Sequence, residues 1–165
     1  MIQIIEAEGA LLDQAEALVK RVFPYQDFAE RMSFWAYRRR DNPLVQRGMR
    51  LFGVSVLLHY WVAINDQGKV CGIIGLYTTP DTEHEAIWLS WFCVDPTQRG
   101  QGIGGKLIEF AIAEARTKGK KMLCLYTSDD PNEAAAQMLY EKYGFKIVKE
   151  EKNFSHTTYY RTLLL

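Results

Sequence analysis

A strand, a glycine-rich loop and a helix follow one another over residues 88–118, and this stretch constrains the chain more than any other. Residues 88–94 form an apolar run of aromatic and β-branched character that ends in Asp95-Pro96. Four glycines follow, at positions 100, 102, 104 and 105. Beyond them apolar residues recur at helical spacing, at Leu107, Ile108, Ala111, Ile112 and Ala115. The pattern predicts a βα unit whose connecting loop carries few side chains.

The glycine-rich loop has the features of an anion-binding site. Glycine leaves the backbone N–H groups uncovered and adopts φ of either sign. Because the helix begins where the glycines end, its first unpaired amides and the positive end of its dipole face the same point. Such a place binds phosphate oxygens, and Arg99 and Lys106 would add positive charge. We therefore expect a phosphate-bearing ligand here.

Two common phosphate-binding loops are alternatives for this stretch. Gly100 and Gly105-Lys106 begin a P-loop pattern, but Leu107 stands where the magnesium-binding hydroxyl is needed, which excludes that loop. Gly100, Gly102 and Gly105 have the spacing of the dinucleotide fingerprint, but no acidic residue ends a second parallel strand about 20 residues further on. A dinucleotide-binding enzyme stays open as the weaker alternative.

Three segments resemble the GNAT superfamily of N-acetyltransferases. The run Arg99-Gly100-Gln101-Gly102-Ile103-Gly104 resembles the acyl-CoA-binding signature Arg/Gln-x-x-Gly-x-Gly/Ala of that family. Val94-Asp95-Pro96 lies upstream at the family's spacing, and residues 139–145, Leu-Tyr-Glu-Lys-Tyr-Gly-Phe, look like its other recurrent segment. Together they cover roughly residues 87–148 in the family's order, which makes the resemblance specific.

Length and composition agree with one soluble domain. The chain has 165 residues, 48% of them hydrophobic and 24% charged, which suits a single globular domain over residues 1–165. The 20 basic and 20 acidic side chains cancel, so the charge does not favour a nucleic-acid partner. The N-terminal residues lack the pattern of a signal peptide, and no run of about 18 apolar residues occurs. We therefore expect no membrane partner and a cytoplasmic location.

Cysteine and histidine do not indicate a metal site. Cys71, Cys93 and Cys124 each lie in an apolar, strand-like run, as small core residues do in a reducing compartment. The three histidines are scattered along the chain. We therefore expect no metal.

The remaining patterns predict a mixed α/β fold. Strands are expected at 2–7, 60–64, 69–78, 87–94, 122–127, 145–150 and 157–164, and helices at 8–22, 28–40, 104–118 and 130–143. Residues 44–58 fit either a short helix or a flap. By the right-handed crossover rule the strands at 87–94 and 122–127 are parallel. This order is the one the GNAT family shows, so the resemblance implies an α/β (α+β), GNAT-like fold with a mixed sheet of about seven strands, about four flanking helices and splayed central parallel strands.

The resemblance implies where acetyl-CoA would bind. Its pantetheine arm would pair with the strand that ends at Val94, like an added strand, and the loop would take the pyrophosphate. By position, the cofactor-binding residues are Phe92, Cys93, Val94, Arg99, Gly100, Gln101, Gly102, Ile103, Gly104, Gly105, Lys106, Asn132 and Tyr140. Tyr140 matches the family tyrosine that donates a proton to the departing thiolate, although its residue type alone would favour a buried aromatic with a satisfied hydroxyl.

The acceptor implied by the resemblance is an amine held beside the same strand. Trp88, Ser90 and Trp91 are expected to shape the acceptor side. The first two helices, which usually cover the acceptor in this family, are rich in aromatic residues that also suit packing on the sheet. A primary amine near pKa 10.4 costs about 4.6 kcal/mol to hold neutral at pH 7, so a base is useful.

No carboxylate occupies either family position for this base. Some members carry a glutamate on the central strand, where this chain has Trp88, and others carry it at the end of the next strand, where the chain has Tyr126 or Ser128. Glu83 and Glu85, just before the central strand, are the nearest candidates for a catalytic base, although a solvated turn would also carry them.

A second departure concerns the helix that carries the tyrosine. The asparagine that the family often has seven residues before the tyrosine is Glu133 here, and Asn132 lies one residue earlier. The role of Asn132 at the cofactor is therefore an open question.

The sequence predicts an acetyltransferase that moves acetyl from acetyl-CoA to a primary amine by direct attack in a ternary complex, with no metal and no covalent enzyme intermediate. A small cationic amine, held through cation–π contact, and a peptide N-terminus or lysine are equally open as acceptors. The alternative of another class is a non-catalytic acyl-CoA-binding sensor, which the missing strand carboxylate supports and the intact Tyr140 opposes. A homodimer stays open.

Overall fold

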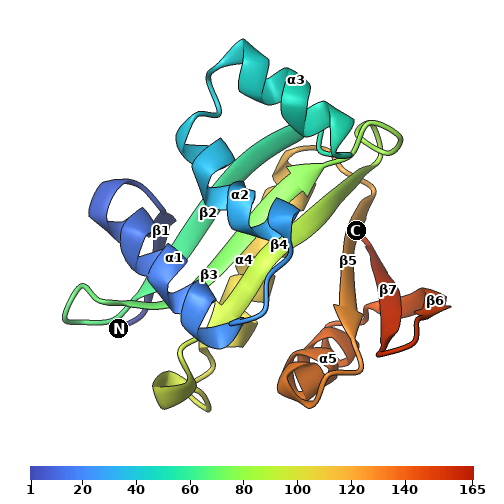
Figure 1. Cartoon of the computed structure of the whole chain (residues 1–165). Coiled ribbons are helices and arrows are strands. Elements are labelled where there is room, and N and C mark those ends of the chain that lie inside the picture. Colours follow the sequence, from blue (N-terminus) through green and yellow to red (C-terminus); the bar gives the residue numbers. More distant parts are fainter.

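A single seven-stranded sheet runs through the molecule in the computed structural model (Figure 1). The structure describes residues 1–165, apart from the side chains of residues 56–58. The strands are β1 (Gln3–Glu6), β2 (Val56–Ile64), β3 (Val70–Thr78), β4 (Ala86–Val94), β5 (Met122–Ser128), β6 (Lys146–Lys152) and β7 (Thr157–Leu164). Their order across the sheet is β1-β2-β3-β4-β5-β7-β6, and β4 with β5 is the parallel pair in an otherwise antiparallel sheet.

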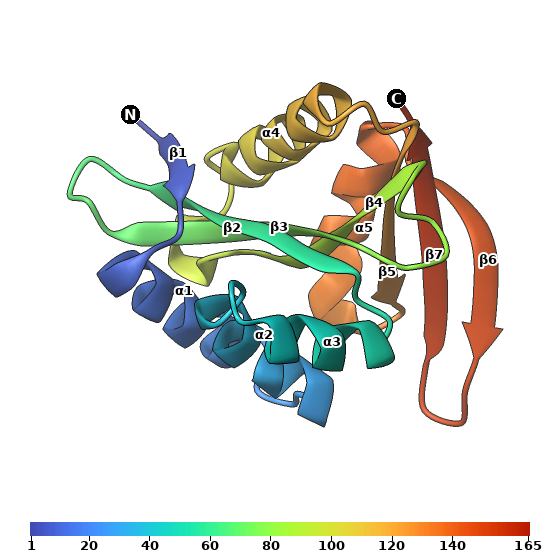
Figure 2. The ribbon, with the colours of Figure 1, turned by 90° about the horizontal axis from the view of Figure 1, so that it is seen from above.

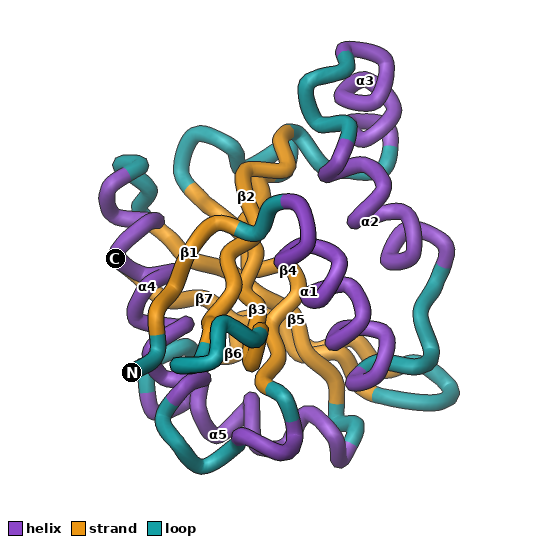
Figure 3. Tube along the Cα trace, turned by 90° about the vertical axis from the view of Figure 1, so that its left-hand side faces the viewer, coloured by secondary structure: helices purple, strands orange, loops and turns teal.

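Helices cover both faces of this sheet. They are α1 (Gly9–Val22), α2 (Phe28–Arg38), α3 (Pro43–Leu51), α4 (Ile103–Thr117) and α5 (Ala134–Lys142), with short 3-10 turns η1 (Pro96–Gln98) and η2 (Pro131–Glu133). Figure 2 shows α1, α2 and α3 below the sheet and α4 above it. Figure 3 shows α1, α2 and α3 following one another along one side, with α3 outermost.

Two hydrophobic clusters fix these helices to the sheet. On the α4 side, the fully buried Leu107, Ile108 and Ala111 pack against β3, β4 and β5, and Tyr140 of α5 joins the same cluster. On the α1 side, Leu18 and Val19 pack against β2 and β3. Full burial of each large aliphatic side chain contributes about 1.5–3 kcal/mol, so the helical periodicity of the sequence directly sets which helix faces meet the sheet.

A β-bulge interrupts the alternation of β4. Gly72, Ile73 and Ile74 pair with residues 94, 93 and 92, whereas Leu76 and Tyr77 pair with residues 89 and 88. One residue of β3 therefore opposes two residues of β4, Ser90 and Trp91. As a result Ser90 and Trp91 both face the α2 side, where they contact side chains of β2 and α2.

The parallel strands separate after a short contact. β4 and β5 pair only at Ala86, Ile87 and Trp88, which oppose residues 122, 123 and 124. Within the described part of the chain, residues 89–94 and 125–128 form no further pairs with each other. β5 instead pairs along its whole length with β7. The splay implied by the resemblance is therefore present, and it opens on the side of the glycine-rich loop.

The predicted fold class is confirmed, and the number of helices is the main correction. The sequence suggested about four helices, whereas the structure has five because part of the ambiguous segment 44–58 is helix α3. Asn42 caps α3 by accepting a hydrogen bond from the Leu44 amide at 2.9 Å, and Pro43 occupies its first turn. The second helix ends at Arg38 rather than residue 40, and β2 begins at Val56 rather than residue 60.

Candidate active site

The glycine-rich loop presents unpaired amides at the start of α4. Gly100 and Gly102 have φ of +80° and +76°, in the left-handed region that only glycine adopts freely. The first backbone hydrogen bond of the helix runs from the Lys106 amide to the Gly102 carbonyl at 3.1 Å. Among the described residues, none accepts a hydrogen bond from the amides of residues 100–105. A Cβ at position 100 or 102 would meet nothing within 4 Å, so the loop is open to a ligand.

Asp95 fixes the turn from β4 into this loop. The residue is 4% exposed. Its carboxylate accepts hydrogen bonds from the Thr97 amide at 3.0 Å and from the Thr97 hydroxyl at 2.8 Å. The Arg21 guanidinium of α1 donates to the same carboxylate at 2.6 Å. Burial pushes the pKa of Asp95 upward, but the bonds from Thr97 and the charge of Arg21 outweigh burial and hold it below its usual value. Asp95 therefore fixes the turn that leads from β4 into the loop.

Tyr140 lies at the base of the gap between β4 and β5. Its ring packs against Phe92 and Phe145 with centroid distances of 5.8 and 5.7 Å. Burial raises the pKa of its phenol, so the side chain is a neutral proton donor at every ordinary pH. Within the described part of the molecule, no group hydrogen-bonds the Tyr140 hydroxyl, and Tyr140 is one of the residues that line the main cavity. A hydroxyl held in this way is available to a ligand.

Glu133 explains one departure from the family pattern. One of its oxygens accepts hydrogen bonds from the Thr127 hydroxyl and from the Ser128 amide, the latter at 2.6 Å. Gln137, one turn along α5, donates to the Ser128 carbonyl at 2.8 Å. These bonds satisfy backbone groups at the end of β5, where the strand has left β4. Glu133 therefore ties the start of α5 to the splayed strand.

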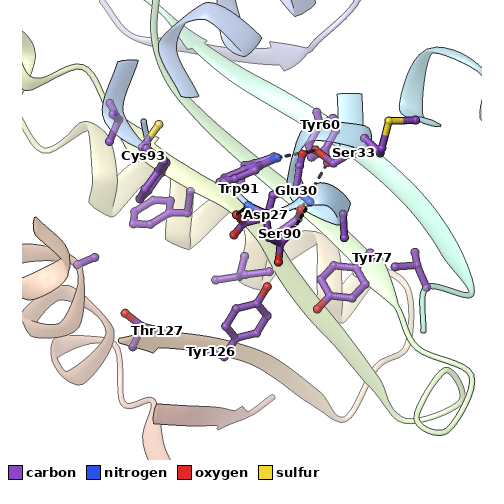
Figure 4. A pocket seen from close by; sticks show the side chains of 18 of the residues that line it. Asp27, Glu30, Ser33, Tyr60, Tyr77, Ser90, Trp91, Cys93, Tyr126 and Thr127 are labelled. Atoms are coloured by element: carbon purple, nitrogen blue, oxygen red, sulfur yellow. Dashed lines mark hydrogen bonds between the residues drawn. The ribbon is translucent and has the colours of Figure 1, made fainter. Parts of the chain in front are cut away.

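One cavity of about 1290 Å³ joins the loop, Tyr140 and the helices of the opposite side. Figure 4 shows side chains that line it, with Tyr77 and Tyr126 projecting into the same space as Ser90. Its described lining includes three carboxylates, Asp27, Glu30 and Glu133. The charge of Glu133 acts on Glu30 and helps to raise the pKa of Glu30, and the charges of both carboxylates raise the pKa of the Tyr126 phenol. This part of the cavity therefore carries negative charge.

Glu30 is a half-buried carboxylate of this lining. It forms a capping box with Asp27, in which the Asp27 amide donates to the Glu30 carboxylate at 2.8 Å and the Glu30 amide donates to the Asp27 carboxylate at 2.8 Å. Burial is the largest influence on its pKa and raises it, and the charges of Asp27 and Glu133 act in the same direction. A raised pKa makes this carboxylate a better proton acceptor than a solvated glutamate. Sequence analysis missed Glu30 because a capping-box glutamate at a helix start is an ordinary structural feature.

Ser90 and Trp91 line the cavity as expected, and Trp88 does not. The Trp91 indole donates to the Ser33 hydroxyl at 2.8 Å, and Ser90 lies 3.4 Å from the Tyr60 hydroxyl. Trp88 lies where β4 and β5 are still paired, and its indole donates to Thr82 at 3.1 Å. It borders a smaller cavity beside β7 instead. The difference comes from position along β4, because Trp88 lies where β4 is still paired with β5, whereas Ser90 and Trp91 lie beyond the last pair.

The two carboxylates expected to supply a base lie away from the main cavity. Glu85 is at the closed end of the strand pair and forms an ion pair with Lys121 at 2.7 Å. Glu83 lies 3.6 Å from Arg50, and its backbone carbonyl accepts a hydrogen bond from Lys120. The Ser55 hydroxyl, followed by the charges of Arg50 and Lys120, lowers the pKa of Glu83, and the bond and charge of Lys121 lower the pKa of Glu85. The structure therefore corrects this expectation: neither Glu83 nor Glu85 reaches the space beside Tyr140.

Most of the expected cofactor residues gather around one end of the cavity. Its lining includes Phe92, Cys93, Val94, Arg99, Gly100, Gly102, Ile103, Gly104, Gly105, Asn132 and Tyr140. Gln101 and Lys106 lie outside this lining. Burial raises the pKa of the Cys93 thiol to about 12, so this cysteine stays protonated and acts as a core residue. Asn132 borders the cavity from η2, and its backbone amide donates a hydrogen bond to the Asp130 carboxylate at 2.8 Å.

The described residues contain no group of three or more side chains placed to hold a metal ion. None of the helices, each of which lies within the described residues, has the length and apolar character needed to cross a membrane.

Comparisons with known proteins agree with this geometry. Residues 57–147 match the family model described as Acetyltransferase (GNAT) domain, which is more than half of the chain. A Xenopus tropicalis protein named Probable N-acetyltransferase 14 is 34% identical over 87 residues, which is 53% of this chain and 40% of that protein. The chain therefore spans less than half the length of the curated relatives it matches.

Solved structures share the fold over nearly the whole chain. An acetyltransferase of the GNAT family from Staphylococcus aureus superposes with a TM-score of 0.73 at 21% identity, covering 99% of both chains. A GNAT family acetyltransferase from Elizabethkingia anophelis with acetyl-CoA bound gives 0.67 at 21% identity, covering 99% of this chain and 98% of the other. On the family match, the shared fold and the open amide loop beside splayed strands, this chain belongs to the GNAT superfamily of acetyltransferases.

Proposed function

We propose that this protein is an N-acetyltransferase that moves acetyl from acetyl-CoA to a primary amine by direct attack in a ternary complex. The observation that carries the proposal is the gap between β4 and β5, with unpaired loop amides at its mouth and the free Tyr140 hydroxyl at its base. The loop fits a diphosphate, because its amides are unpaired among the described residues and glycines at 100 and 102 leave it uncovered. The edge of β4 over residues 89–94 fits an extended amide-bearing arm.

Two residues of the cavity have proposed chemical roles. The amine nitrogen attacks the thioester carbon, and the carbon–sulfur bond breaks as the tetrahedral intermediate collapses. Tyr140 donates its phenolic proton to the departing thiolate and recovers one from solvent. Glu30, directly or through water, accepts the proton that the amine loses, which its raised pKa favours. The products are the N-acetylated amine and CoA, and no bond to the enzyme forms.

The remaining expectations stay proposals of the same kind. Gln101 and Lys106 would contact the phosphates from outside the cavity lining, and Asn132 would contact the arm of the cofactor. We place the protein in a reducing compartment such as the cytoplasm, which the three buried, free thiols of Cys71, Cys93 and Cys124 support. A single domain over residues 1–165 is supported by the continuous sheet.

Thiol release from acetyl-CoA in the presence of a panel of primary amines tests the proposal. The expected result is amine-dependent release of one CoA for each acetylated amine, together with thermal stabilisation of the protein by CoA. Stabilisation by CoA with no turnover on any amine would favour the sensor instead. Stabilisation by NAD and none by CoA would point to the dinucleotide-binding alternative.

A further inference from the structure

Helix α3 presents an apolar side to the cavity rather than to the core. Leu44, Val45, Gly48 and Met49 line the cavity, followed by Phe52 just after the helix. This spacing places them on one side of the helix. Among its described residues α3 contributes no buried side chain, and Leu44 and Phe52 remain 75% and 66% exposed. The apolar side of α3 therefore lacks the packing that such a surface normally has.

Helix α2 faces the same space with a second apolar surface. Phe28, Met32 and Trp35 line the cavity from α2, and Phe28 is 68% exposed. The two helices thus form apolar walls of the same cavity that Ser90 and Trp91 line. Large apolar side chains exposed together around a cavity indicate a binding surface rather than scattered surface residues.

Negative charge lies where these walls approach Ser90 and Trp91, at what we call the inner end of the cavity (Figure 4). Asp27 and Glu30, at the start of α2, line the same cavity, and both act on the Tyr126 phenol that projects into it. The basic group on the α2 wall, Arg39, lies over the Trp35 ring at 4.7 Å. An ammonium group would be attracted to the carboxylates, whereas a carboxylate on the acceptor would be repelled by them. The hydroxyl groups of a sugar-like acceptor would lose water against the apolar walls without gaining partners there.

We propose that the acceptor is a primary amine with a large apolar body, an alkyl or arylalkyl amine, whose hydrocarbon part lies between α2 and α3. Its nitrogen lies at the inner end of the cavity near Glu30 and Ser90. The proposal rests on the proposed acetyltransferase activity for its reaction, but it makes a separate statement about which molecule occupies the cavity.

An alkylamine series measures the apolar contribution directly. The compounds are n-butylamine, n-hexylamine and n-octylamine, with ethanolamine as the hydrophilic comparison, and kcat/KM is measured at saturating acetyl-CoA. Each added methylene that is buried should raise kcat/KM about fourfold, the equivalent of about 0.8 kcal/mol. From butyl to hexyl the expected gain is therefore about 15-fold. A flat or falling series, with ethanolamine as good a substrate, would overturn the proposal.

Calorimetric binding to the CoA complex separates this proposal from the activity. 2-Phenylethylamine should bind with a negative heat-capacity change, and the neutral 2-phenylethanol should bind at least about tenfold more weakly. Binding of the amine without turnover would remove the proposed activity and leave the occupant in place. Turnover of hydrophilic amines without binding of 2-phenylethylamine would support the acetyltransferase activity and refute the apolar acceptor.

Two neighbouring residues supply a matched pair of variants. Phe52 lines the cavity, whereas Leu51, in the last turn of α3 and 88% exposed, does not. Phe52→Asn should lose at least about tenfold in affinity for 2-phenylethylamine, while Leu51→Asn should bind it as the parent protein does. Equal losses in both variants, or none in either, would contradict the proposal. If the amine does not bind and Phe52→Asn instead dissociates a dimer, a second copy of the chain occupies this groove.

Discussion

Replacing Tyr140 by phenylalanine tests the central assignment, because it removes one hydroxyl and little else. Among the described groups none hydrogen-bonds that hydroxyl, and the ring contacts with Phe92 and Phe145 do not depend on it. The Tyr140→Phe variant should therefore fold with a free energy of unfolding within about 1 kcal/mol of the parent. Any large loss of activity then reports chemistry rather than misfolding.

The size of that loss follows from what the proton is worth to the leaving group. For a thiol of pKa about 8.5, the protonated form is more stable at pH 7 than the thiolate by about 1.5 pKa units, or about 2 kcal/mol. Protonation of the leaving group can therefore lower the barrier by at most about this amount. This limits the benefit of Tyr140 to about 30-fold in kcat at pH 7. Burial raises the pKa of Tyr140 and keeps it protonated, so the donor itself does not titrate over the assay range. The ratio of parent to variant should therefore shrink as the pH approaches 8.5, where a free thiolate becomes as stable as the thiol.

The assay is the release of CoA thiol from pH 6.5 to 9 with one saturating amine. Changes in the ionisation of the amine affect parent and variant equally, so they cancel in the ratio. The affinity for CoA, measured by calorimetry, should be the same in both proteins. A parent-to-variant ratio near one at pH 7, or a ratio that does not change with pH, would show that Tyr140 does not donate this proton.

Three further changes test other parts of the site. Glu30→Gln keeps the capping box with Asp27 but removes the charge, so the free energy of unfolding should change by less than about 0.5 kcal/mol. The value of kcat/KM should fall about 100-fold. The acidic limb of the pH profile, which the raised pKa of Glu30 sets, should disappear. Gly102→Ala meets no steric clash but must adopt φ near +76°, so denaturant unfolding should show a loss of about 1 kcal/mol, with weaker CoA binding by calorimetry. Asp95→Asn should cost about 1–2 kcal/mol at pH 7. Because the folded-state pKa of Asp95 is depressed, its contribution to stability is present above about pH 3.9 and is lost as the pH falls through the folded-state pKa. The free energy of unfolding of the variant should therefore vary less with pH in that range. A pH dependence equal to that of the parent protein would refute this role.

Local patterns were sufficient for most of the fold. The bounds of β3, β4, β7, α1 and α4 agree with the predicted ranges to within about one residue, because most of these elements have a clear apolar period and a turn or capping residue nearby. Helix α3 was the element that the sequence left most ambiguous. Its apolar residues face a cavity rather than the core, so the sequence lacked the longer pattern that marks a packed helix.

The carboxylates of the site were the hardest features to predict. Glu83 and Glu85 are close to the central strand in sequence, but the pairing of β4 with β5 closes that end and places them beside Lys120 and Lys121. Glu30 is sixty residues away from Ser90 in the chain, yet it lines the same cavity because the β4 bulge turns Ser90 and Trp91 toward α2.

The sequence by itself determined the βα unit, its bare amides and the tyrosine that follows, because φ preference, helix periodicity and helix capping act over a few neighbouring residues. The tertiary structure decided which end of the strand pair opens, which carboxylates reach the acceptor and which apolar surfaces face it. These features depend on strand register and on one inserted residue in β4, which shift every later side chain to the opposite face of the sheet.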